Sequence, residues 1–233
     1  MTTMAKRVDA ALRWLRRNSS KRIRADMGQR YGIHTAKAMG VSVAKIQQLG
    51  KQLGRDHELA VALWATGWYE ARMLTAFVDA PAQVTAVQMD RWARDFDNWA
   101  IVDTLCFNLF DRTPHAWSKV ELWSRREGEF VKRGAFALIA ALALHDQEAP
   151  DARFVRALRL IERAATDERH FVKKGVCWAL RVMGRRNRTL NLAAVRSARR
   201  LAASGLASAR WIGNESVREL TSPAVRRRLA ART

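Results

Sequence analysis

Hydrophobic residues recur along the chain at helical spacing, in segments of ordinary helix length separated by short breaks. A first amphipathic segment spans 3–17, and a second runs from the capping serines Ser19 and Ser20 to about Arg30. A third begins near Ser42. Further helices are predicted at about 56–66, 68–79, 82–95, 98–111, 115–126, 128–145, 151–166, 168–186, 189–204 and 207–221. No segment alternates clearly enough to indicate a sheet, so the prediction is an all-α protein.

The breaks between these segments carry ordinary helix-ending residues. They fall at Pro81, at Thr113-Pro114, at Pro150-Asp151 and at Gly205. Because the connections are this short, neighbouring helices are expected to form antiparallel pairs.

One motif occurs twice. Phe130-Val131-Lys132-Arg133-Gly134 returns 41 residues later as Phe171-Val172-Lys173-Lys174-Gly175, and each copy opens a long apolar helix. That offset is typical of helix-pair solenoids of the HEAT or armadillo type. We therefore expect a right-handed α-solenoid of stacked antiparallel helix pairs with a basic concave face, and Lys132, Arg133, Lys173 and Lys174 are expected to point into that face.

The predicted domain organisation is a single solenoid over 1–233. It consists of an N-terminal helical cap (1–40), helical repeats (41–222) and a basic C-terminal tail (223–233).

Charge narrows the choice of partner. Forty-two Lys and Arg against 22 Asp and Glu leave a formal net charge of +20, which indicates a polyanion. Nucleic acid is favoured over an anionic membrane, because no segment has the pattern of a basic amphipathic anchor. A ribosome-associated protein, or a merely basic protein of an Arg-rich proteome, is the alternative.

Other features indicate a cytoplasmic protein. Met1 to Arg17 lacks the apolar run of a signal peptide, and the longest apolar run, Ala135 to Leu144, is too short to span a bilayer. Cys106 and Cys177 have no metal-like spacing and fit a reducing compartment.

Several kinds of catalytic site are excluded by the sequence. Gly50 to Gly54 lacks the P-loop pattern, the five His are scattered, and no Ser or Cys nucleophile motif is present. Neither a metal nor an organic cofactor is expected. The remaining candidates are carboxylate and aromatic residues, above all Asp103 with Trp99, together with Trp178 in the second copy of the repeat.

The stretch Asp95 to Cys106 reads as a helix start, with Asp97 or Asn98 as the N-cap. Trp99 and Asp103 are four residues apart, so they share one helix face. An indole beside a carboxylate attracts a cation, because the indole offers the negative face of its π system and the carboxylate carries a full negative charge. The alternative is that Trp99 is a core aromatic residue and Asp103 a solvated one.

Three blocks together resemble the AlkD-like DNA alkylation-repair family: Asp97-Asn98-Trp99-Ala100-Ile101-Val102-Asp103, Phe130-Val131-Lys132-Arg133, and Phe171 to Arg181. Members of this family are HEAT-like-repeat DNA glycosylases that release positively charged N-alkylated purines. The resemblance runs from about Gly40 to the C-terminus, with the blocks in the family's order.

The resemblance implies a role for each matching residue. Asp103 would be the catalytic carboxylate, Trp99 and Trp178 two aromatic walls, Arg133 a DNA-backbone contact and Phe171 a further aromatic of the groove. Arg181 ends the third block and is assigned to DNA binding with the lysines of the repeat. One departure is Ala100, where the family often has an acidic residue.

The resulting hypothesis is a monomeric glycosylase that acts on double-stranded DNA containing alkylated purines. It requires two indoles and one acid to converge on the inside of a positively charged arc. A helical-repeat protein that binds DNA or RNA without catalysis is the main alternative, and a protein–protein scaffold is a third.

Overall fold

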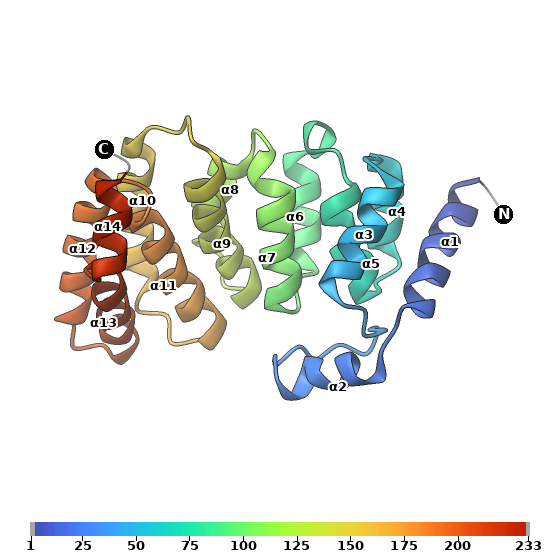
Figure 1. Cartoon of the computed structure of the whole chain (residues 1–233), viewed down its shortest axis with the longest axis horizontal. Coiled ribbons are helices and arrows are strands. Elements are labelled where there is room, and N and C mark those ends of the chain that lie inside the picture. Colours follow the sequence, from blue (N-terminus) through green and yellow to red (C-terminus); the bar gives the residue numbers. More distant parts are fainter. Residues whose placement is uncertain (1–2, 232–233) are drawn as a thin grey trace. The chain divides into compact units, whose positions relative to one another are not determined.

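The computed structural model describes residues 3–231, and within that range the chain forms only helices, as expected (Figure 1). No helix in the described range is both long and apolar enough to cross a membrane. The helices are α1 (Thr3–Arg17), α2 (Lys21–Gln29), α3 (Val43–Leu53), α4 (His57–Ala65), α5 (Tyr69–Val78), η1 (Pro81–Gln83), α6 (Ala86–Arg94), α7 (Trp99–Asn108), η2 (Phe110–Arg112), α8 (Ala116–Trp123), α9 (Glu129–His145), α10 (Asp151–Ala164), α11 (His170–Gly184), α12 (Arg188–Ala202), α13 (Ala207–Leu220) and α14 (Pro223–Ala230).

Side-chain caps explain where many of these helices begin. Ser20, Ser42, Asp56, Asn98 and Asn187 each accept a hydrogen bond from the backbone N–H three residues later. Such a cap satisfies one of the N–H groups that a first turn leaves without a helical partner.

Caps also account for two differences from the predicted elements. The segment expected at 82–95 is a short 3-10 turn, Pro81–Gln83, followed by a separate helix, because Thr85 accepts from the N–H of Gln88 and starts α6 anew. Residues of the expected C-terminal tail form α14, which Ser222 caps by accepting from the N–H of Val225.

The chain divides into two compact units, and the boundary lies between His115 and Ala116. In the first unit, α5 packs against α3 and α7 to form one row. Helix α4 lies beside α5, and α1 contacts both α4 and α5. Trp64 of α4 stacks on Trp92 of α6, with ring centroids 4.3 Å apart.

A buried carboxylate joins the N-terminal segment to this row. Glu70 on α5 is fully buried and accepts hydrogen bonds from the N–H groups of Met39 (2.9 Å), Gly40 (2.7 Å) and Val41 (3.3 Å). Gly40 has φ +83° and its backbone approaches Ser20 closely, so a side chain there would be strained.

The second unit consists of successive helix pairs, α8/α9, α10/α11 and α12/α13. The second members, α9, α11 and α13, pack side by side in one row, and α10 and α12 pack together in another. The apolar run of α9 is buried from Ala135 to Ala143, with only Leu144 at its end exposed, which confirms α9 as a core helix. This two-row arrangement is typical of helical repeats.

Candidate nucleic-acid interface and catalytic residues

The start of α7 holds the first candidate pair, Trp99 and Asp103. Asn98 is buried and caps the helix by accepting from the N–H of Ile101 at 3.0 Å, so the cap is Asn98 rather than Asp97. Ile101, Val102, Leu105 and Cys106 are all buried and fix the rotation of α7. Trp99 and Asp103 lie outside this apolar face and both remain partly exposed, one helical turn apart.

Trp99 is held by a contact that sequence patterns do not reveal. Its indole Nε1 donates to the backbone carbonyl of Tyr31 at 2.9 Å. Tyr31 follows α2 and is exposed, with the guanidinium of Arg30 5.5 Å from the centre of its ring. The N-terminal segment therefore orients this indole.

Ala100 lies on another face of α7, roughly 100° around the helix from Trp99, and is 7% exposed. Position 100 therefore belongs to the core of the first unit. A carboxylate introduced at position 100 would therefore be buried. The difference from the family's usual acidic residue at Ala100 lies on the packed side of α7.

The two copies of the repeated motif contact each other in the second unit, at the starts of α9 and α11. The Phe130 and Phe171 rings lie 5.2 Å apart, and Glu129 accepts from the N–H of Phe171 at 3.0 Å. Arg133 donates through Nη1 to the Phe171 carbonyl at 2.9 Å and is buried. A Cβ at Gly175 would lie 3.4 Å from Arg133 Cγ, so glycine leaves room for the arginine. The two copies of the motif thus lie at the starts of α9 and α11, two helices that pack against each other.

Four side chains form a partly exposed face of α11, which we call the α11 stripe: Phe171, Lys174, Trp178 and Arg181. Their spacing of i, i+3, i+7 and i+10 places them on one side of the helix. Arg181 also pairs with Glu219 of α13 at 2.7 Å. The stripe brings together four of the nine residues that the sequence singled out.

The field around the start of α11 is positive. Desolvation, followed by the charges of Lys174 and Lys173, lowers the pKa of His170. Lys173 turns toward α13, with Nζ 5.2 Å from the ring centre of Trp211.

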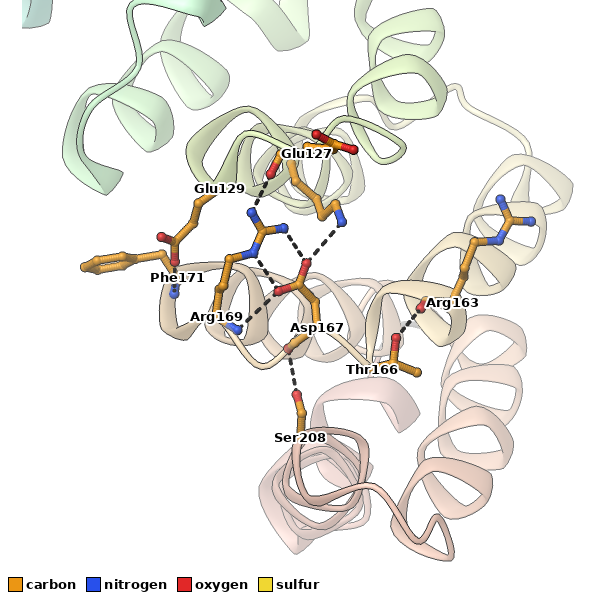
Figure 2. Close-up of polar contacts among 9 residues, drawn as sticks. Glu127, Glu129, Arg163, Thr166, Asp167, Arg169, Phe171 and Ser208 are labelled. Atoms are coloured by element: carbon orange, nitrogen blue, oxygen red, sulfur yellow. Dashed lines mark hydrogen bonds and ion pairs between the residues drawn. The ribbon is translucent and has the colours of Figure 1, made fainter.

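A polar cluster that the sequence did not indicate surrounds Asp167 (Figure 2), and Lys132 contributes to it through a hydrogen bond to the Asp167 carboxylate. Asp167, in the loop between α10 and α11, accepts from Lys132 Nζ at 3.0 Å and from Arg169 at Nε (2.9 Å) and Nη2 (2.5 Å). Its backbone carbonyl accepts from Ser208 of α13 at 2.9 Å, and Arg169 also reaches the carbonyl of Glu127. These bonds, led by the one from Arg169, lower the pKa of Asp167 to about 2.

Within residues 3–231 no group of three or more His, Cys, Asp or Glu side chains is placed to hold a metal ion. Cys106 and Cys177 are both buried free thiols.

Comparison with known proteins shows what this arrangement belongs to. A family model described as DNA alkylation repair enzyme matches residues 11–219. No curated protein sequence matches the chain.

Among solved structures, the chain is similar to a member of a new family of proteins related to the HEAT-like repeat DNA glycosylases with affinity for branched DNA structures. The TM-score is 0.75 at 17% identity, and the match covers 91% of this chain and 95% of that one. A designed armadillo repeat protein in complex with a (KR)4 peptide matches with a TM-score of 0.40 at 10% identity, over 81% of this chain and 80% of that chain. The fold is therefore that of the HEAT-like helical repeats, and the chain belongs to the DNA alkylation repair enzyme family.

Proposed function

We propose that this protein is a DNA glycosylase that hydrolyses the N-glycosidic bond of cationic N3- or N7-alkylated purines in duplex DNA. Membership of the alkylation-repair family and the net charge of +20 support DNA as the substrate.

The observation that carries the proposal is the pairing of Trp99 and Asp103 on α7. A partly exposed carboxylate lies one turn from an indole whose ring is held by the Tyr31 carbonyl, while Ile101, Val102 and Leu105 of the same helix are buried. A rigid aromatic face beside an acid suits a positively charged ligand, since both attract cations.

The chemistry fits these residue types. Alkylation at N3 or N7 places a positive charge on the base, so the base leaves with the electron pair of the C1′–N bond and becomes neutral. The sugar then carries the positive charge, which an ionised Asp103 would stabilise while it positions the attacking water. Water bonds to C1′ and loses a proton. A strong general acid is not needed, because the leaving base starts as a cation.

For the second unit, we propose that the α11 stripe contacts the DNA, with Trp178 as its aromatic side chain and Lys174 and Arg181 as its charges. By its likeness to the family we assign Arg133, which donates to the Phe171 carbonyl at the start of α11, to the DNA backbone as well. Lys132 and Lys173 are assigned to the DNA backbone as sequence-independent contacts.

The test is incubation of the purified chain with duplex DNA containing 7-methylguanine or 3-methyladenine, with the released base quantified. Wild type is expected to excise, and Asp103→Asn to lose at least 100-fold in rate while still binding the duplex, on the order of the loss seen when one electrostatic catalytic group is removed.

Asp97→Asn is the matched control, since Asp97 is an exposed carboxylate two residues before α7 and the charge change is the same. It should excise as wild type does. Equal excision by Asp103→Asn and wild type would remove Asp103 from the mechanism.

A second candidate is a DNA-binding protein without catalysis. The solved relative is described as having affinity for branched DNA structures, and Ala100 leaves α7 without the acid that often follows the tryptophan in this family. This function predicts tight binding to a four-way junction, no base released from either lesion, and no effect of Asp103→Asn on binding.

A further inference from the structure

An arginine-lined groove lies in the second unit between α8 and α10. Its volume is about 560 Å³. Its apolar floor includes Val120 of α8 with Ala157 and Leu160 of α10, and Trp117 of α8 forms part of its wall. Trp178 lies on α11, so the groove is built from other helices than the α11 stripe.

Five exposed arginines line this groove, and we call them the groove arginines: Arg125, Arg153, Arg156, Arg159 and Arg163. Glu121 is the one acidic residue in the lining. Four of the groove arginines follow α10 from Arg153 to Arg163, ten residue steps that correspond to about 15 Å along the helix axis. The result is an elongated row of positive charge.

The protein does not neutralise this row. Among residues 3–231, no carboxylate lies within ion-pair distance of Arg125, Arg156, Arg159 or Arg163. Glu162, the last acidic residue of α10, instead accepts hydrogen bonds from Ser197 and Arg200 of α12. Arg153 lies with its guanidinium 5.7 Å from the ring centre of Trp117.

A packed α10 needs no such row for its stability. Phe154, Leu158 and Ile161 of α10 are buried, whereas its four groove arginines are exposed. Exposed like charges at i, i+3 spacing repel one another and slightly destabilise a helix. An external anion would relieve that repulsion.

We propose that the groove binds the sugar–phosphate backbone of a duplex DNA segment other than the one that carries the lesion. Guanidinium forks match phosphate oxygens, and this contact requires no particular base sequence. About 15 Å of helix corresponds to roughly four phosphates of one strand at 3.4 Å per nucleotide. The regular row of charges fits a repeating phosphodiester better than an acidic peptide, whose carboxylates follow no fixed spacing. The distinction from the lesion-bearing segment rests on the proposed function, whereas the binding of DNA in the groove does not require base excision.

The experiment titrates the whole chain with a short undamaged duplex at low salt and measures binding stoichiometry and salt dependence by fluorescence anisotropy. Wild type is expected to bind two duplexes per protein. The triple variant Arg156→Gln, Arg159→Gln, Arg163→Gln is expected to bind one. Where low salt still allows the triple variant to bind the second duplex, the salt slope of that second binding step should be smaller than in wild type by about 2.7, or roughly 0.9 for each phosphate that an arginine no longer neutralises.

The matched control is Arg188→Gln, Arg196→Gln, Arg199→Gln, which removes three exposed arginines of α12 outside the groove. It should retain both duplexes. If the triple variant folds poorly, the single variant Arg159→Gln takes its place and is expected to lower the salt slope of DNA binding by about 0.9.

Three results would overturn the proposal: one duplex per wild-type protein, equal stoichiometry and slope in wild type and triple variant, or displacement of the second duplex by polyglutamate of equal charge. Base release is read separately on methylated duplex. Loss of base release with two duplexes still bound would count against the glycosylase proposal alone.

Discussion

Trp99 donates its indole N–H to the backbone carbonyl of Tyr31, 68 residues earlier in the chain, at 2.9 Å. The hydrogen bond connects the segment after α2 to the start of α7, four residues before Asp103. The orientation of this indole therefore depends on a part of the chain that the sequence suggested only as a terminal cap.

Trp99→Phe tests that dependence, because phenylalanine retains an aromatic face and removes the donor. We expect faster amide hydrogen exchange around residues 28–33, since an anchoring hydrogen bond is worth about 1 kcal/mol. Under the proposed function, base release should fall several-fold. Unchanged exchange in this segment would show that the bond does not hold it.

Trp178→Ala removes the aromatic side chain of the α11 stripe. A desolvated cation–π contact of about 1–2 kcal/mol predicts a 5- to 30-fold drop in the rate of base release, with Trp178→Phe in between. Trp14→Ala is the control, because Trp14 is also partly exposed but lies on α1. A rate for Trp178→Ala within twofold of wild type would exclude the indole from the reaction.

Asp167 should make the protein sensitive to acid. Its pKa in the folded state, about 2, lies below its ordinary value near 3.8, so its stabilising contribution is present above pH 3.8 and is lost as the pH falls toward 2. A shift of this size corresponds to about 2 kcal/mol.

We expect Asp167→Asn to lower the free energy of unfolding by about 2 kcal/mol at pH 7 and by much less near pH 2, as measured by urea denaturation. Glu168→Gln, a change at the exposed neighbouring carboxylate, should leave both values near those of wild type. An equal loss at the two pH values would mean that the ion pairs of Asp167 are not the source of its contribution.

Glu70→Gln tests the attachment of residues 39–41 to α5. The buried carboxylate accepts three backbone N–H groups, and an amide presents one oxygen and two donors in its place. A loss of roughly 2–3 kcal/mol is expected, or about 5–10 °C in Tm for a chain of this length. The exposed Glu58→Gln should change Tm by less than about 1 °C.

Much of the candidate site was predictable residue by residue, but its internal contacts were not. Helical spacing places Trp99 with Asp103 and Phe171 with Trp178 on shared faces, and in the structure all four side chains are partly exposed. It also reveals that Lys132 is in an ion pair with Asp167 and that Arg133 is buried. Their DNA contacts stay predictions.

The sequence by itself determined most of the helices, the caps at Ser20 and Asn98 and the repeat that opens α9 and α11, because these follow from side chains a few residues apart. Only the tertiary structure decided which carbonyl holds Trp99, which amides surround Glu70 and how Asp167 connects α9 to α13. Backbone N–H and carbonyl groups occur at nearly every residue, so a long-range partner of this kind has no sequence signature. Helix packing alone selects it.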